Sequence, residues 1–168
     1  MTLPVLEATV CYLRKNGMTL FIDYRNFPHP LHQGYFSPPG GKLEIEETKE
    51  QAVIREVLEE THIKINSLIY RGKVLFSNEK RLFGGKPAKN SYLVHYFDSL
   101  DFDDNLAQAT EGALAWTLEE EINNLPMRKG DRQIWKWLKI YKEIEAEIVE
   151  DEKGSINAYL IGFKNQDF

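Results

Sequence analysis

The feature that most constrains this chain is an acidic segment, Gly40 to Ile63, in which glutamates recur three or four residues apart. On a helix, residues at that spacing lie side by side, and like charges there are destabilising. A helix is nevertheless predicted, because Thr48 and Gln51 have the spacing of a capping box and an apolar stripe follows at helical period. The stripe consists of Val53, Ile54, Val57 and Leu58.

Three carboxylates, Glu56, Glu59 and Glu60, are expected on the side of this helix opposite the stripe, within one turn of each other. A solvated acidic face normally carries cations four residues away from its anions, but Arg55 has no other cation within five residues on either side. A solvated face stays one interpretation. The other is a bound divalent cation, because carboxylate oxygens suit hard ions such as Mg²⁺ or Mn²⁺.

The rest of the chain is mostly typical of strands. Alternating or continuous apolar runs predict strands over 7–13, 19–24, 68–77, 91–97 and 113–117. Asn16-Gly17 predicts a tight hairpin between the first two. Residues 25–41, rich in Pro, Gly and His, are expected to form a long functional loop. A second amphipathic helix is expected over 131–144, followed by a hairpin of 145–149 and 158–163. These elements predict one α+β domain over residues 1–168.

Composition narrows the function. The 168 residues are 42% hydrophobic, enough for a substantial core. The net charge of −5 argues against a general nucleic-acid binder or a membrane-surface protein. The single cysteine, Cys11, excludes an internal disulfide and fits a reducing compartment. Without a signal peptide or an apolar run of about 18 residues, a cytoplasmic protein is expected.

The acidic segment matches a long pattern of fixed positions. In this chain these are Gly41, Glu47, Arg55, Glu56, Val57, Glu59, Glu60, His62 and Ile63. The pattern resembles the Nudix box of the Nudix hydrolase (MutT-like) family, with His62 where that box has its second glycine. His62 follows the predicted helix end, where glycine serves as a C-cap.

This resemblance implies an α/β/α sandwich around a mixed sheet, with the box as loop-helix-loop. It also implies hydrolysis of a nucleoside diphosphate linked to another group, using Mg²⁺ or Mn²⁺. The implied metal ligands are Glu56, Glu59, Glu60 and the Gly40 carbonyl, and either Glu56 or Glu59 would also help to deprotonate the attacking water. Gly41 is an implied structural position of the box.

Four further residues have roles implied by the same resemblance. Arg55 would orient a carboxylate through two hydrogen bonds, with Glu47 supporting it. Glu111, five residues before Trp116, stands where related enzymes place a catalytic or metal-contacting glutamate, although a surface carboxylate is the alternative. Arg25 stands where relatives place a phosphate-contacting arginine, and an exposed charge at a strand end is its alternative.

The segments "GGKLE", "EGALAW" and "KGDRQIWKWL" are similar to those of MutX-type 8-oxo-dGTP diphosphatases. In that group Phe36 and Ser37 would read the base, although some relatives carry asparagine in place of Ser37. Asp131 would contact the purine edge, where a shared or protonated carboxylate can hydrogen-bond guanine. An ordinary helix N-cap is the alternative for Asp131.

Other functions stay open. One is a Nudix enzyme for ADP-ribose, a nucleotide sugar, a dinucleoside polyphosphate or capped RNA. Another is a non-catalytic nucleotide-binding Nudix module, which the intact set of glutamates disfavours. The expected partner is a nucleotide substrate, with neither a stable nucleic-acid partner nor a membrane, and a homodimer is expected by analogy.

Overall fold

The computed structural model describes residues 5–78, 91–103 and 113–167. Its helices are α1 (Lys49–Thr61), α2 (Lys129–Ile140) and a 3₁₀ turn at Ile122–Asn124. Its strands are β1 (Leu6–Lys15), β2 (Met18–Asp23), β3 (Phe36–Ser37), β4 (Gly40–Lys42), β5 (Lys64–Ile65), β6 (Ile69–Ser77), β7 (Tyr92–Ser99), β8 (Phe102–Asp103), β9 (Ala113–Leu118), β10 (Tyr141–Glu150) and β11 (Ile156–Asn165). No helix in these ranges is long and apolar enough to cross a membrane.

The first hairpin forms where the sequence predicts it. Asn16 and Gly17 adopt positive φ values of 52° and 71°, which is the geometry of a two-residue hairpin turn. Lys15 pairs with Met18 across this turn. The turn therefore joins the end of β1 to the start of β2, and the two strands pair antiparallel beside it.

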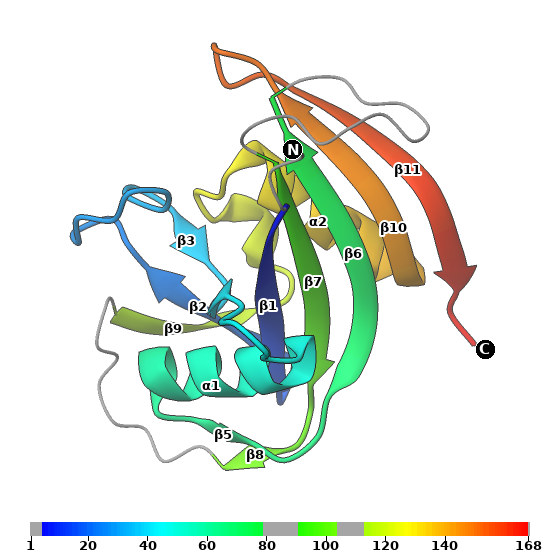
Figure 1. Ribbon diagram of the computed structural model, residues 1–168. Coiled ribbons are helices and arrows are strands. Elements are labelled where there is room, and N and C mark those ends of the chain that lie inside the picture. Colours follow the sequence, from blue (N-terminus) through cyan, green and yellow to red (C-terminus); the bar gives the residue numbers. More distant parts are fainter. Residues whose placement is uncertain (1–4, 79–90, 104–112, 168) are drawn as a thin grey trace.

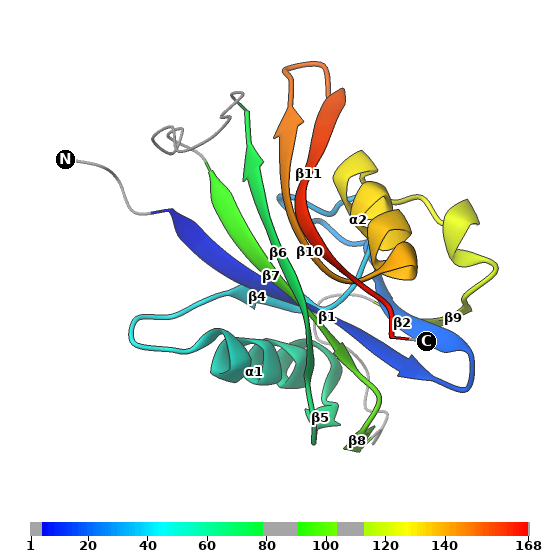
Figure 2. The same cartoon turned by 90° about the vertical axis from the view of Figure 1, so that its right-hand side faces the viewer.

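The main sheet is mixed, as expected. Its strands follow the order β11-β10-β6-β7-β1-β2-β3, with β4 added beside β1 and β9 beside β2. The pairs β1–β7 and β6–β10 are parallel, and the other pairs are antiparallel. Helix α1 covers one face and α2 the other (Figures 1 and 2), so the α/β/α sandwich is confirmed.

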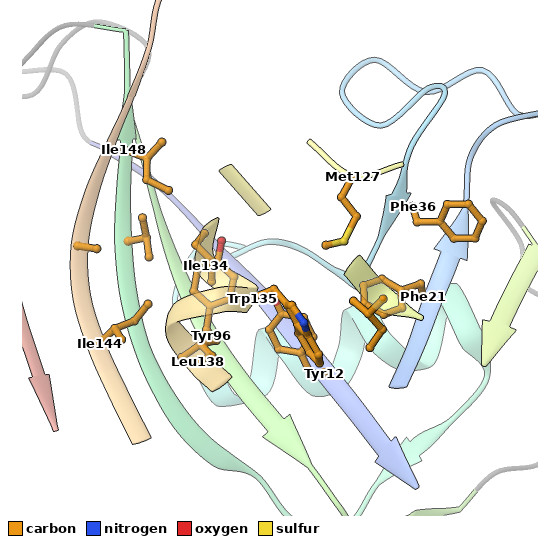
Figure 3. Close-up of a cluster of buried hydrophobic side chains, with 13 residues drawn as sticks. Tyr12, Phe21, Phe36, Tyr96, Met127, Ile134, Trp135, Leu138, Ile144 and Ile148 are labelled. Atoms are coloured by element: carbon orange, nitrogen blue, oxygen red, sulfur yellow. The ribbon is translucent and has the colours of Figure 1, made fainter. Parts of the chain in front are cut away.

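Each face of the sheet has its own core, because strand side chains alternate between faces. On β1, Tyr12 points toward α2, while Cys11 and Leu13 point toward α1. Figure 3 shows the α2 side, where Trp135 packs 5.3 Å from the ring of Tyr12. Each helix therefore packs against its own core, α1 on one face of the sheet and α2 on the other.

The second helix is shorter than predicted. The expected range of 131–144 is wrong at both ends: α2 starts at Lys129, and the chain turns directly from Ile140 into β10. Ile144 belongs to β10 and pairs with Gly72 of the parallel strand β6. Gly72 has φ +116°, and a Cβ there would lie 1.8 Å from the Ile144 carbonyl oxygen, so the two strands approach very closely.

Candidate active site

Helix α1 begins and ends with the signals that the sequence carries. The Gln51 backbone N–H donates to Thr48 Oγ1 at 3.1 Å, and the Thr48 N–H donates to Gln51 Oε1 at 3.0 Å, which completes the capping box. At the other end His62 is the C-cap, in the left-handed region with φ 59°, and its N–H donates to the Leu58 carbonyl. A histidine there stands in the conformation that glycine adopts most easily.

The buried face of α1 is rotated relative to the predicted stripe. Its buried residues are Ala52, Val53, Val57 and Thr61. Ile54 and Leu58, predicted to be buried, are 37% and 45% exposed, so that part of the stripe is wrong. The rotation moves Glu56 and Glu60 from the far side of the helix to the edge of its packed face, next to β4. The acidic residues therefore face the Gly40-Gly41 segment.

Two glycines allow this close approach. A Cβ on Gly41 would lie 2.3 Å from the carboxyl carbon of Glu56, and a Cβ on Gly40 would lie 2.0 Å from the Thr9 carbonyl oxygen. The Gly40 N–H donates to Glu60 Oε2 at 2.9 Å. Strand β4 thus holds Glu60 through a backbone hydrogen bond, and Glu56 can lie against the same strand because Gly41 has no side chain.

Arg55 connects the acidic residues to one another. Its Nε and Nη2 donate to the two oxygens of Glu47, at 2.8 and 3.0 Å. Its Nη1 donates to Glu56 Oε1 at 2.9 Å and to Glu59 Oε2 at 3.2 Å. Nη2 also donates to the Lys42 carbonyl at 3.0 Å. A single guanidinium therefore offsets the repulsion that the sequence predicts for this helix.

These contacts shift the pKa values of Glu47 and Glu56 in opposite directions. The hydrogen bond from Arg55, together with one from the Glu44 N–H, lowers the pKa of Glu47 to about 2. Partial burial raises the pKa of Glu56, although Arg55 opposes the shift. The same partners, Glu47 first, raise the pKa of Arg55, so its positive charge is secure at any physiological pH.

The donor chemistry of this cluster fits Mg²⁺ or Mn²⁺, which prefer carboxylate and carbonyl oxygens. Within the described ranges, however, no three acidic, histidine or cysteine side chains converge as a ready metal site. Arg55 and the Gly40 N–H hold oxygens of Glu56, Glu59 and Glu60 instead. The Glu59 side chain is 59% exposed, and a bound cation would have to replace the hydrogen bonds that now hold these oxygens.

Of the residues predicted to contact the base, Phe36 and Asp131 lie on the α2 side of the sheet. Phe36 packs with Met127 in the core shown in Figure 3, and its ring is only 6% exposed. Ser37 is also buried, and its hydroxyl donates to the Pro38 carbonyl at 3.3 Å. The short segment Ser37-Pro38-Pro39-Gly40 connects this side of the molecule directly to the acidic cluster.

Asp131 is not the N-cap of α2. Arg128 occupies that position without a side-chain capping bond, and Asp131 lies in the first turn. Burial raises the pKa of Asp131 to about 6, and the nearby Glu150 adds to the shift, while Arg128 opposes it. The carboxyl group is therefore set apart from ordinary surface aspartates, which leaves the ligand-contact interpretation open.

Two predicted residues have different outcomes. Arg25 follows β2 and is held by Asp23, a partner that the sequence analysis did not single out. The signal was available, since an aspartate commonly accepts a hydrogen bond from the backbone N–H two residues later, as Asp23 does from Arg25. Glu111 lies outside the described residues. Ala113, the first described residue after it, pairs with Asp23.

Comparison with known proteins points in one direction. The family model described as "NUDIX domain" matches residues 5–138. An uncharacterised Nudix hydrolase of Bacillus subtilis, YvcI, is 32% identical over 129 residues, covering 76% of this chain and 75% of its own. A putative 8-oxo-dGTP diphosphatase 3 of Mycobacterium tuberculosis is 28% identical over 109 residues, covering 64% of this chain and 49% of its own length.

Solved structures share the fold. The MutT protein from Bacillus halodurans superposes with a TM-score of 0.76 at 22% identity, covering 94% of this chain and 98% of its own. The NUDIX domain of Shewanella oneidensis NrtR, in complex with ADP ribose, gives a TM-score of 0.60 at 16% identity, covering 82% and 88%. At these identities the similarity to the two structures shows a shared fold and nothing further.

Proposed function

This chain belongs to the Nudix family of hydrolases, and we propose that it converts 8-oxo-dGTP, or another deoxynucleoside triphosphate, to the monophosphate and pyrophosphate. Family members act on nucleoside diphosphate derivatives, so the proposal concerns which derivative is cleaved and by which residues. The observation that carries it is the position of Glu56, held between Gly41 and Arg55 with Glu60 beside it.

The proposed roles follow from these contacts. Glu56, Glu59 and Glu60, with the carbonyl of Gly40, would hold a divalent cation, which supplies charge neutralisation and a more acidic bound water. Arg55 keeps Glu56 and Glu59 in place through Nη1. Glu47 keeps Arg55 in place by accepting from two of its nitrogens, and so acts on the reaction only indirectly.

The proton of the attacking water needs an acceptor. Glu56 and Glu59 both stand in the cluster, and partial burial, which raises the pKa of Glu56, makes its carboxylate a stronger base than an ordinary glutamate. Glu59 is the more accessible to solvent, with a side chain 59% exposed against 17% for Glu56. Either residue can accept the proton without a covalent enzyme intermediate, since the oxygen of water forms the new bond to phosphorus. Glu111 remains a proposed further contributor.

The choice of a purine substrate is supported by Asp131, on the α2 side of the sheet. Asp131, with a pKa near 6, is protonated in part of the molecules at neutral pH and can then donate as well as accept. Such a group suits the purine edge, where donors and acceptors alternate. The likeness to the Mycobacterium tuberculosis protein also supports this substrate. A role in cleansing the nucleotide pool would place the protein in the cytoplasm and link it to DNA repair.

A Nudix enzyme for ADP-ribose, a nucleotide sugar, a dinucleoside polyphosphate or capped RNA is the main alternative. It is separated by a hydrolysis panel of 8-oxo-dGTP, dGTP, ADP-ribose and diadenosine polyphosphates with Mg²⁺, in which the products are identified. Pyrophosphate release with a strong preference for 8-oxo-dGTP is the expected result. A preference for ADP-ribose would overturn the proposed substrate and leave the family assignment intact.

A non-catalytic nucleotide-binding module is the second alternative. The change Glu59→Gln keeps the size of the side chain but removes its charge, so it should abolish Mg²⁺-dependent turnover and leave nucleotide affinity nearly unchanged. Full turnover in this variant would rule out the proposed role of Glu59. We also propose that residues 1–168 act as one domain and that the protein forms a homodimer, which light scattering of the purified chain tests.

A further inference from the structure

The guanidinium of Arg25 is fixed in one plane. Its Nε and Nη2 donate to the two carboxylate oxygens of Asp23, at 3.0 and 2.8 Å. The Arg25 backbone N–H donates to Asp23 Oδ1 at 3.0 Å as well. A two-point contact of this kind sets the orientation of a planar group, which a single hydrogen bond would leave free to rotate.

One face of this plane is covered by Phe36. The Cζ atom of Arg25 lies 4.8 Å from the centre of the Phe36 ring. The ring itself is buried to 6% exposure and packs in the core with Met127. With Arg25 on one side and the core around the rest, Phe36 has no free face on which a base could stack.

The other face of the guanidinium is open, since the Arg25 side chain is 53% exposed. Its charge is largely offset, because Arg25 lowers the pKa of Asp23 and keeps that carboxylate ionised. A phosphate that approaches Arg25 therefore meets the negative Asp23 at the same time. A flat, weakly hydrated cation that is already paired is a poor phosphate ligand and a good stacking surface.

We propose that the open face of Arg25 is the surface on which the nucleobase stacks, with the guanidinium sandwiched between the base and Phe36. The ligand class is the nucleoside part of the substrate, a purine above all, since its two fused rings cover the most area. This differs from the sequence-based expectation that Arg25 contacts phosphate. The inference rests on the proposed function in that it assumes a nucleotide substrate.

The test separates the two halves of a nucleotide. Deoxyguanosine, which carries no phosphate, and inorganic pyrophosphate are each titrated into the protein and followed by NMR. Arg25→Lys keeps the charge but loses the plane, so it should weaken deoxyguanosine binding by about tenfold, the usual range for one stacking contact, and leave pyrophosphate binding unchanged. Asp23→Asn should act in the same direction, because the guanidinium is no longer held flat.

Lys164→Gln is the control. Lys164 donates to Glu143 on the β10–β11 hairpin, at the opposite end of the sheet from β3, and its replacement should leave both affinities unchanged. Amide spectra of each variant confirm that it is folded. Loss of pyrophosphate binding in Arg25→Lys with unchanged nucleoside binding would overturn the proposal. So would tighter pyrophosphate binding in Asp23→Asn, which a phosphate-binding arginine released from its partner predicts.

The same experiment distinguishes this inference from the proposed function. If the wild-type chain binds deoxyguanosine through Arg25 but hydrolyses none of the nucleotides in the panel, the proposed reaction fails and the stacking surface stands. If it hydrolyses them while deoxyguanosine does not bind, or binds equally well to Arg25→Lys, the stacking surface fails alone.

Discussion

Gly41 offers the sharpest test of how the acidic cluster is built. The change Gly41→Ala adds one methyl group, whose carbon would lie 2.3 Å from the carboxyl carbon of Glu56. Ordinary contact begins near 3.4 Å, so the carboxyl carbon must retreat by about 1.1 Å. Displacing a catalytic group by about 1 Å costs on the order of 10²-fold in rate, and that is the loss expected in kcat/KM.

Stability should change much less than activity in this variant. The atoms in the way belong to a carboxylate that can swing outward, so the added methyl group should cost about 1 kcal/mol, within the usual range for single substitutions. Nucleotide hydrolysis and urea unfolding are measured side by side. Gly162→Ala is the control, since its added Cβ would lie 3.9 Å from the Glu145 Cβ, an ordinary contact, and both quantities should be nearly unchanged.

A double-mutant cycle tests whether the effect of Gly41→Ala is transmitted through the Glu56 side chain. If Gly41→Ala acts through Glu56, its destabilisation should largely disappear when Glu56 is already alanine. The reasoning is refuted if Gly41→Ala keeps kcat/KM within about threefold of wild type, a change too small for a 1 Å displacement. It is also refuted if the destabilisation is the same with and without the Glu56 side chain.

Four further predictions concern helix α1, the residues that hold it, and Asp131 on helix α2. Arg55→Lys removes the two-point contact with Glu47 and should lower kcat by about 10- to 100-fold, as measured by turnover at saturating nucleotide. Glu47 has a pKa lowered to about 2 from an ordinary 4.5, so its stabilising effect is complete above about pH 4.5 and lost as pH falls toward 2; in Glu47→Gln, acid unfolding curves should lack that component. His62→Gly should raise the free energy of unfolding by about 1 kcal/mol, because glycine adopts φ near 59° without strain, and a drop in the melting temperature would contradict this. Asp131 has a pKa raised from 3.8 to about 6, so the folded state holds its proton more tightly, and the free energy of unfolding falls as pH rises between those values. In Asp131→Asn the decrease in this free energy from pH 4 to pH 8 should be smaller than in wild type by on the order of 2 kcal/mol. An equal decrease in the two proteins would refute the assignment.

Local signals in the sequence predicted the elements well where one residue type decides the geometry. Asn16-Gly17 requires positive φ and forms its turn, and Thr48 with Gln51 caps α1 as expected. The predicted end of α2 was wrong because a helical and a strand period overlap in the sequence there. Ile140 and Ile144 are spaced as on one face of a helix, whereas Ile144 also fits the two-residue alternation along β10. The close approach of Gly72 to Ile144 selects the strand, and nothing near Ile144 in the sequence announces it.

The candidate site was predictable in composition but not in arrangement. Glu56, Glu59 and Glu60 were singled out from their spacing, yet the side of α1 on which they lie depends on its contact with β4. Exposed positions such as Ile54 and Leu58 show that hydrophobicity alone does not choose the buried face. The pairing of Arg25 with Asp23 is local, two residues apart, but the place of Arg25 over Phe36 depends on how β2 and β3 meet, a tertiary fact that short motifs do not encode.

The short segment from Ser37 to Gly40 fixes a distance within the candidate site. Three residues of extended chain span at most about 10 Å, and the two buried prolines, whose φ is fixed, keep that link stiff. Ser37 and Gly40, which lies beside the acidic cluster, are therefore kept at a nearly constant distance from each other. Under the proposed function, this covalent link sets the distance between the part of the protein that contacts the base and the acidic cluster that acts on the phosphates.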